Sequence, residues 1–212
     1  MEEITLTTEA GAFGGMPASL PNFGSSYNAE AVIDHGSMFD LYTGGGLDLA
    51  ILGMAQTDEK GNVNVSKFKI PGKADRLTGP GGFIDISQST QQIVFAGTFN
   101  AKCKMEVADG QLNIISEGTG KKFVRGVDQI TFSGKFAAET GQNITYVTER
   151  CVFKLIDGKI TVTEIAPGID LEKDILSLME FKPVISSELK EMDRGLFMEK
   201  WDGLKTVFGE SN

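Results

Sequence analysis

Histidine, cysteine and tryptophan are scarce in this chain of 212 residues. The single histidine, His35, excludes a histidine-rich metal site, and the two cysteines, Cys103 and Cys151, lack the spacing of metal ligands. We therefore expect no metal and interpret both cysteines as buried or half-buried thiols in a reducing compartment. The sequence also contains no run of 18 or more apolar residues, so it predicts no membrane-spanning helix.

Clustered positive charge is missing as well. The formal net charge is −9, from 29 acidic and 20 basic residues, and the acids are spread along the chain. Nucleic acids and anionic membranes both require clustered Lys and Arg, so we expect neither as a partner. Local sites for anionic small molecules remain compatible with this charge. The first residues do not resemble a secretion signal, and the expected location is the cytoplasm.

Glycine is the residue in excess. Its 26 copies are nearly twice the usual share of about 7%, and they form clusters rather than a repeat. The clusters are Gly11, Gly14 and Gly15, then Gly44, Gly45 and Gly46, then Gly79, Gly81 and Gly82. Such clusters mark places where the backbone approaches another group closely or takes a positive φ. One acid, Glu9, stands between a β-prone run and the first cluster, a setting that would suit a catalytic carboxylate.

The hydrophobic pattern predicts one α/β domain over residues 1–212. We expect a strand over residues 4–8 that ends at Glu9, because these residues are largely β-branched. Continuous apolar runs at 49–54 and 91–97 predict strands covered on both faces, as in a parallel sheet. The later part of the chain alternates apolar and polar residues around Asp109-Gly110 and Asp157-Gly158, which predicts two antiparallel hairpins.

Three helices are expected in the second half. The segment 131–142 predicts a short helix before a strand at 143–149. The segment 166–181 predicts a longer helix with Asp170 as its N-cap. The segment 186–201 predicts a final helix, with Leu189, Met192 and Leu196 on its buried face.

Several segments together resemble the β half of a family I coenzyme A transferase. They are Glu9 with the loop AGAFGGMP, the block FDLYTGGGLDLAILGMAQTDEKGNVNVSKF, GPGGFIDISQ, TERCVFKL and TEIAPGIDLEKDIL. Their order and spacing match over nearly the whole chain, with the nearest likeness to the carboxy-terminal half of single-chain acetate or propionate CoA-transferases. The resemblance implies an open, mainly parallel sheet of the CoA-transferase (NagB/RpiA-like) type with added antiparallel hairpins.

The resemblance also implies a reaction. CoA would move between a short-chain acyl-CoA and a carboxylate acceptor, with CoA as a substrate and no cofactor. Glu9 matches the family's nucleophilic glutamate, which forms a glutamyl-CoA thioester, while Gly79, Gly81 and Gly82 fall on its G-x-G-G loop. That loop supplies backbone amides near the reacting carbonyl. The chemistry agrees, since a nucleophilic carboxylate needs space for the acyl group, partial removal of water and fixed donors for the oxyanion.

Other residues keep two interpretations. The candidates for the acyl or CoA pocket are Gly14, Gly15, Gly45, Gly46 and Asn62, and the alternative for each is a role in the fold, as turn glycines or through Asx-type bonds. Glu149 and Arg150 either form a structural ion pair or line the CoA path. His35 is expected to be a surface or core residue, because this mechanism needs no general base.

Finally, the resemblance implies a partner. In the family, a helix and a glycine-containing strand and loop precede the glutamate strand, whereas only eight residues precede Glu9 here. We expect the domain to lack that helix and strand, to need an α half or α subunit in a homo- or hetero-oligomer, and to be inactive alone. The alternative function is that of a non-catalytic fragment or ligand-binding module of the same fold. The segment IPGK resembles the β subunits of oxoacid transferases, so the preferred acyl group stays open.

Overall fold

The computed structural model describes residues 4–201 and 203, and the chain divides into two compact units where the sequence predicted one domain. Unit 1 consists of Met1–Ala50 and Pro80–Gln92, and unit 2 of Ile51–Gly79 and Ile93–Asn212. Within the described ranges, no helix has both the length and the apolar character needed to cross a membrane.

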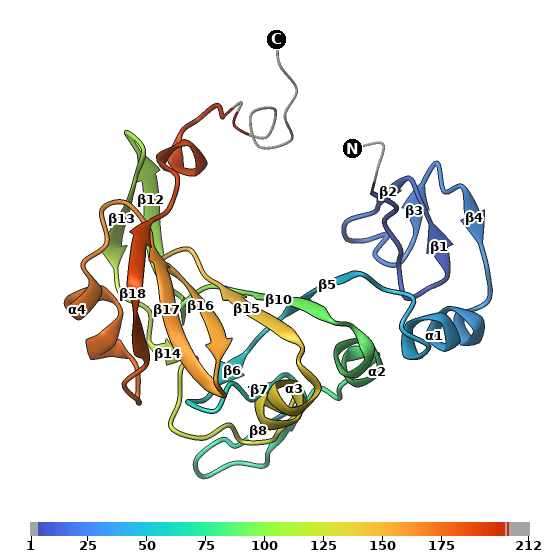
Figure 1. The fold of residues 1–212 in the computed structure, drawn as a ribbon, viewed down its shortest axis with the longest axis horizontal. Coiled ribbons are helices and arrows are strands. Elements are labelled where there is room, and N and C mark those ends of the chain that lie inside the picture. The colour runs from blue at the N-terminus through green and yellow to red at the C-terminus, as the bar shows by residue number, and fades with distance from the viewer. Residues whose placement is uncertain (1–3, 202, 204–212) are drawn as a thin grey trace. The chain divides into compact units, whose positions relative to one another are not determined.

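Unit 1 is built from two small β pairs and two packed helices. Strand β1 (Ala12–Phe13) pairs antiparallel with β4 (Ala31–Val32), and β2 (Met16–Pro17) pairs antiparallel with β3 (Ser26–Tyr27). Helix α1 (His35–Thr43) packs against α2 (Phe83–Ser89), and both are labelled in Figure 1. The buried apolar side chains of these helices are Met38, Tyr42, Phe83 and Ile86. Asp34 caps α1, because its Oδ1 accepts the N–H of Ser37 at 3.0 Å.

A six-stranded sheet with the order β18-β17-β16-β15-β10-β5 is the largest element of the fold (Figure 1). Its strands are β5 (Leu49–Gly53), β10 (Gln92–Ala96), β15 (Asn143–Val147), β16 (Cys151–Ile156), β17 (Lys159–Ile165) and β18 (Val184–Glu191). The sheet is mostly parallel, with antiparallel pairing from β15 through β16 to β17 and parallel pairing of β17 with β18. The expected α/β class, with added antiparallel hairpins, is therefore confirmed.

Four further antiparallel pairs belong to unit 2. They are β6 (Gln56–Thr57) with β7 (Val63–Asn64), β8 (Lys67–Phe68) with β9 (Arg76–Leu77), β11 (Asn100–Ala101) with β14 (Gly120–Lys121), and β12 (Lys104–Ala108) with β13 (Gln111–Ser116). Both Asp-Gly hairpins form as predicted, β12–β13 and β16–β17. Their central residues take the positive φ that such turns require, 55° and 72° at Asp109 and Gly110 and 51° and 69° at Asp157 and Gly158.

Aromatic side chains fill the core of unit 2. Phe95 on β10 lies with its ring centroid 4.9 Å from that of Phe132 and 5.5 Å from that of Tyr146 on β15. Phe123 lies 4.8 Å from Phe153 on β16 by the same measure. Tyr146 is fully buried, and its hydroxyl donates to the main-chain oxygen of Gly61 at 2.6 Å, so its polar end is satisfied. These contacts anchor the loops beside the sheet to the strands.

Two strand predictions need correction. Residues 4–8 do not form a strand and make only one isolated bridge, from Thr7 to Phe13, because the chain turns back at once and the N–H of Thr8 donates to Ala12. Strand β5 forms where expected, but one of its faces is open. Leu49 is 49% exposed and Ile51 69% exposed, and both point to the same face because they are two residues apart.

Two of the three predicted helices form, and the second of them is shorter than predicted. The short helix forms as α3 (Gly134–Thr140), and the strand predicted after it forms as β15. Asp170 caps α4 (Leu171–Asp174) as predicted, with its Oδ1 accepting the N–H of Lys173 at 2.7 Å. That helix ends after one turn and continues as the 3₁₀ helix η1 (Leu176–Leu178), because the fully buried Ile175 takes a non-helical backbone conformation.

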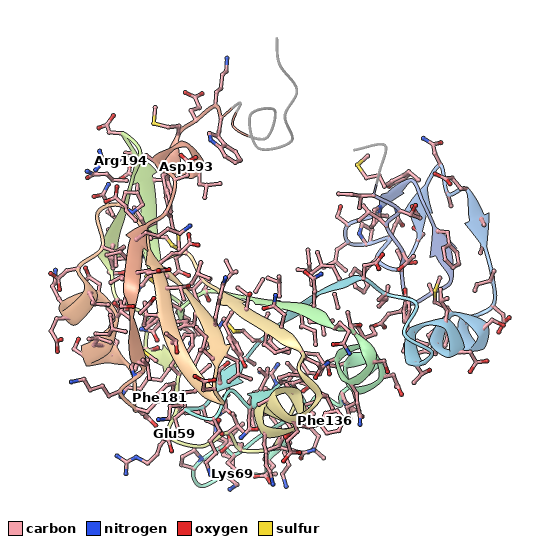
Figure 2. All side chains as sticks on the ribbon, in the orientation of Figure 1. Glu59, Lys69, Phe136, Phe181, Asp193 and Arg194 are labelled. Carbon is pink, nitrogen blue, oxygen red and sulfur yellow. The ribbon has the colours of Figure 1, made fainter. Side chains whose placement is uncertain are left out.

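The predicted final helix is wrong. Its first part, residues 186–191, belongs to the strand β18, whose backbone pairs with β17, and this pairing overrides the helical spacing of the apolar residues. The 3₁₀ helix η2 (Arg194–Phe197) follows, and Figure 2 labels its cap, Asp193, and its first residue, Arg194. Asp193 caps η2 by accepting the N–H of Gly195 at 2.7 Å, and Arg194 pairs with Glu191 at 2.9 Å. Met192 and Phe197 are buried, whereas Leu196 is exposed.

Candidate active site

Glu9 lies at the tip of a tight turn in unit 1. The N–H of Gly11 donates to the carbonyl of Thr8 at 3.0 Å, which closes the turn around Glu9. Gly11 has φ 110°, and a Cβ at this position would lie 2.0 Å from the main-chain oxygen of Ile33. Only glycine fits there, so the first glycine cluster serves to turn the chain directly after the acid. The Glu9 side chain is exposed.

One face of α1 holds the segment that carries Glu9. The Nδ1 N–H of His35 donates to the main-chain oxygen of Glu9 at 2.8 Å, and the hydroxyl of Tyr42 donates to Thr7 Oγ1 at 2.9 Å. Phe39 lies between them, with ring centroids 4.8 Å from His35 and 5.7 Å from Tyr42. Burial, together with repulsion from the Glu9 carboxylate, raises the pKa of Tyr42. Residues 35, 39 and 42 have the spacing of one helix face, a signal in the sequence that could have indicated this support for Glu9.

Gly82 of the G-P-G-G loop lies beside Glu9 within unit 1. A Cβ placed on Gly82 would lie 2.9 Å from Oε1 of Glu9 and 2.4 Å from Cζ of Phe39. The main-chain N–H groups of Gly81 and Gly82 have no hydrogen-bond partner among residues 4–201. Gly79 differs, because its N–H donates to the main-chain oxygen of Ser66 at 3.1 Å. The loop therefore places Gly82 beside the acid and carries two N–H donors that lack a partner among the described residues.

The glycines named as pocket candidates have roles within the fold. Gly14 and Gly15 take φ values of 70° and 68°, and a Cβ on Gly15 would lie 2.1 Å from the main-chain oxygen of Tyr27 in β3. Gly45 takes φ 84° where α1 ends, and a Cβ on Gly46 would lie 2.4 Å from Cδ1 of Leu41. These positions account for the glycines as turn residues, and a part in an acyl or CoA pocket stays a prediction.

Asn62 lies in unit 2 and is 5% exposed. Its Nδ2 donates to Asp58 Oδ2 at 3.0 Å, and its Oδ1 accepts the N–H of Gly134 at 3.0 Å. The side chain is thus engaged in joining the β6–β7 loop to α3, which favours the structural alternative. A part in the pocket stays a prediction for this residue too.

Arg150 forms a structural ion pair, although its main partner is not the neighbouring acid. Its fully buried guanidinium donates from Nη1 and Nη2 to both oxygens of Glu117 at 2.8 Å, and Nε lies 3.3 Å from Glu149. The hydrogen bond from Arg150 lowers the pKa of Glu117 from 4.5 to about 2. Nothing in the spacing of the sequence indicates that Glu117 pairs with Arg150, because the two residues are 33 positions apart.

Both cysteines are thiols, as expected. Cys103 is half-buried, and its sulfur lies 3.1 Å from Nη2 of Arg150. Cys151 is fully buried, and that burial raises the pKa of its thiol, so the reactive thiolate is disfavoured. In the part of the chain that the structure describes, no group of three or more His, Cys, Asp or Glu side chains could hold a metal ion.

Comparison with known proteins identifies relatives along almost the whole chain, although no family model matches it. The caffeate CoA-transferase of Acetobacterium woodii is 72% identical over 210 residues, which are 99% of this chain and 40% of that protein. The acetate CoA-transferase subunit beta of Escherichia coli (strain K12) is 31% identical over 179 residues, which are 79% of this chain and 70% of that subunit.

Solved structures agree with these relatives. The crystal structure of the acyl-CoA transferase YdiF apoenzyme from Escherichia coli O157:H7 is 48% identical, with a TM-score of 0.85 over 94% of this chain and 37% of that one. The structure of the YdiF thioester complex with CoA matches with a TM-score of 0.82 over 93% of this chain and 36% of that one. The chain thus spans about two fifths of the length of these longer relatives. It belongs to the family I CoA-transferases and has the β-type fold of that family.

Proposed function

We propose that this chain is the part of a CoA-transferase that carries the nucleophile, Glu9. The enzyme would move CoA between a short-chain acyl-CoA, such as acetyl-CoA or propionyl-CoA, and a carboxylate acceptor in the cytoplasm, with CoA as a substrate and no other cofactor. The observation that carries this proposal is the meeting of acid and loop, since Glu9 Oε1 lies 2.9 Å from where a Cβ on Gly82 would stand. The names of the relatives, caffeate and acetate CoA-transferases, support it.

The reaction proceeds through a covalent intermediate on Glu9. A carboxylate oxygen of Glu9 attacks the acyl-CoA carbonyl carbon, the C–S bond breaks, and a mixed anhydride and CoA thiolate result. The thiolate attacks the glutamyl carbonyl carbon and releases the donor as a free carboxylate, which leaves a glutamyl-CoA thioester. The acceptor carboxylate then repeats these steps in reverse and departs as its CoA thioester. The reaction consumes no water, so the site has to exclude it.

Backbone donors would stabilise the oxyanions of these steps. Each attack on a carbonyl produces a tetrahedral intermediate, and an amide already aimed at the oxygen contributes about 3 to 4 kcal/mol in comparable sites. The N–H groups of Gly81 and Gly82 suit this role because they have no partner among the described residues. Gly79 would act differently. Its N–H is bound to Ser66, and its φ of 75° shapes the start of the loop.

Glu9 needs a second surface over it. Its side chain is exposed here, whereas a nucleophile of this kind gains from a dry site. Large apolar side chains in unit 1 are also open to solvent, among them Met16 at 66%, Leu20 at 83% and Phe23 at 82%. We propose that an α half or α subunit covers this unit and completes the CoA site, and that the assembled enzyme is a homo- or hetero-oligomer.

Intact mass spectrometry tests the nucleophile. The chain, combined with an α half, is incubated with acetyl-CoA, and a covalent CoA adduct is expected on the peptide that contains Glu9. Glu9→Gln should abolish the adduct. Glu139→Gln serves as the matched control because Glu139 is an exposed acid on α3 in the other unit. Persistence of the adduct in Glu9→Gln would assign another nucleophile, and no adduct from a well-formed assembly would favour a non-catalytic binding module.

A further inference from the structure

An open groove of about 250 Å³ lies in unit 2 and belongs to none of the sites described above. Strands β6, β8, β9 and β14 contribute to it, and the side chains that matter are Phe68, Arg76, Lys121 and Lys122. The remaining lining residues are Gln56 and small residues, so no carboxylate lines it. Three of its eight lining residues are cations, in a chain of net charge −9. That local excess of positive charge indicates an anionic ligand.

Two of these cations are available to a ligand. Arg76 and Lys122 form no ion pair within 4.0 Å among the described residues, whereas Lys121 pairs with Glu180 at 3.6 Å. Lys122 is half-buried, and its Nζ donates to Thr98 Oγ1 at 3.0 Å, which leaves further N–H donors. A half-buried ammonium whose hydrogen bonds are incomplete gains more from an anion than one in open solvent.

The acids that interact with Lys121 and Lys122 already have other partners. Glu180 accepts the N–H of Arg125 and pairs with Lys121. Glu149 accepts the N–H of Phe99 at 2.7 Å and pairs with Arg150, so its charge is shared with a buried guanidinium. Asp128 accepts the Nε2 N–H of Gln56 at 2.9 Å and Asp75 pairs with Lys67, so these carboxylates are engaged too, and cations outnumber acids among the residues that line the groove.

An aromatic surface adjoins the two available cations. Phe68 and Arg76 are paired across β8 and β9, and the guanidinium carbon of Arg76 lies 5.6 Å from the centroid of the Phe68 ring. A planar heterocycle can stack on such a ring and guanidinium, and a phosphate can bind the guanidinium edge. The groove is slightly smaller than the usual pocket for a whole small molecule, so it suits one end of a longer ligand.

We propose that this groove binds a phosphorylated nucleotide, with a phosphate on Arg76 and Lys122 and the base against Phe68. Two ligands carry this chemistry. One is the nucleotide end of CoA, which would extend the substrate site and rests on the proposed function. The other is a free adenine nucleotide that binds as an effector. Nucleotide binding itself requires neither Glu9 nor an α half, so it can be tested on this chain.

Isothermal titration calorimetry of the chain at low ionic strength tests the groove. The probes are adenosine 3′,5′-bisphosphate, ATP and inorganic phosphate. Arg76→Gln and Lys122→Gln should each weaken nucleotide binding by about three- to tenfold, the loss typical of one charge-assisted hydrogen bond in partial solvent. Phe68→Leu should weaken binding of the nucleotides but not of phosphate. Lys159→Gln removes one exposed positive charge on β17 and should change nothing.

The outcomes separate the alternatives. Tighter binding of the bisphosphate than of ATP assigns the groove to CoA, and the reverse order assigns it to an effector. The proposal is overturned if neither nucleotide binds, if phosphate binds as tightly as both, or if Lys159→Gln weakens binding as much as the groove variants. Thermal unfolding of each variant confirms that it is folded. Glu9→Gln should bind nucleotide normally, so failure of the catalytic proposal and of this one can be told apart.

Discussion

Replacing Gly82 with alanine should damage catalysis far more than folding. Gly82 has φ −80° and ψ 1°, which alanine adopts without strain. Its new Cβ would nevertheless lie 2.4 Å from Cζ of Phe39 and 2.9 Å from Oε1 of Glu9. Carbon–carbon contacts are ordinarily about 1 Å longer than the distance from this Cβ to Phe39 Cζ, so the Phe39 ring and the Glu9 carboxylate have to move apart. A displacement of about 1 Å at a reacting group costs roughly a hundredfold in rate, or about 2.7 kcal/mol.

The loss of stability should be smaller. Overpacking costs about 1 to 3 kcal/mol in a core, and the lower value applies because Phe39 is half-buried and Glu9 exposed, so both can shift. Gly141→Ala is the control, since Gly141 has φ 72° and no atom within 4 Å of its added Cβ. That variant should lose about 1 kcal/mol through backbone strain alone and keep its rate.

The assay combines two measurements. The rate of formation of the covalent CoA adduct is followed by intact mass on the chain assembled with an α half, and thermal unfolding is followed on the chain alone. The reasoning is refuted if Gly82→Ala forms the adduct within threefold of the parent rate. It is equally refuted if Gly141→Ala, at the same loss of stability, slows the reaction as much, because the effect would then come from folding and not from the placement of Glu9.

Three further predictions concern the supporting structure. Glu117→Gln should lose about 2 kcal/mol at pH 7, because the buried Arg150 loses its bidentate carboxylate and keeps Glu149 and the main-chain oxygen of Asp174 as partners, while Glu117 is itself about a third exposed. With its pKa lowered to about 2, Glu117 contributes stability above about pH 4.5, so the difference from Glu117→Gln should shrink as the pH falls from 4.5 towards 2 in chemical denaturation. Asn62→Ala should lose about 1 to 3 kcal/mol in urea unfolding without a change in slope, since the N–H of Gly134 loses its acceptor. Ile51→Thr should leave stability within about 0.5 kcal/mol but reduce self-association in sedimentation, and a larger loss would mean that the open face of β5 is covered.

The sequence correctly predicted those turns and helix caps that are determined by residues close together in the chain. The Asp-Gly pairs formed hairpins because those residues tolerate the positive φ of the turns, and Asp170 capped α4 because its carboxylate reaches an N–H three residues ahead. The final helix failed for the opposite reason. The spacing of Leu189, Met192 and Leu196 suits a helix, but the residues up to Glu191 pair with the edge of β17 as part of β18, and nothing near them in sequence indicates that edge.

The candidate site likewise has features that the sequence indicates and contacts that only the packing of distant segments creates. The sequence by itself was enough to single out Glu9 and the G-P-G-G loop and to relate them to a CoA-transferase, because residue types and their order along the chain carry that resemblance. Only the tertiary structure decided that His35 holds the main chain of Glu9, that Gly82 stands beside its carboxylate, and that Arg150 pairs with Glu117. It also gathered cations from separate hairpins into one groove of an acidic chain. Such contacts join residues far apart in sequence, and their geometry comes from the packing of whole elements, which spacing along the chain does not encode.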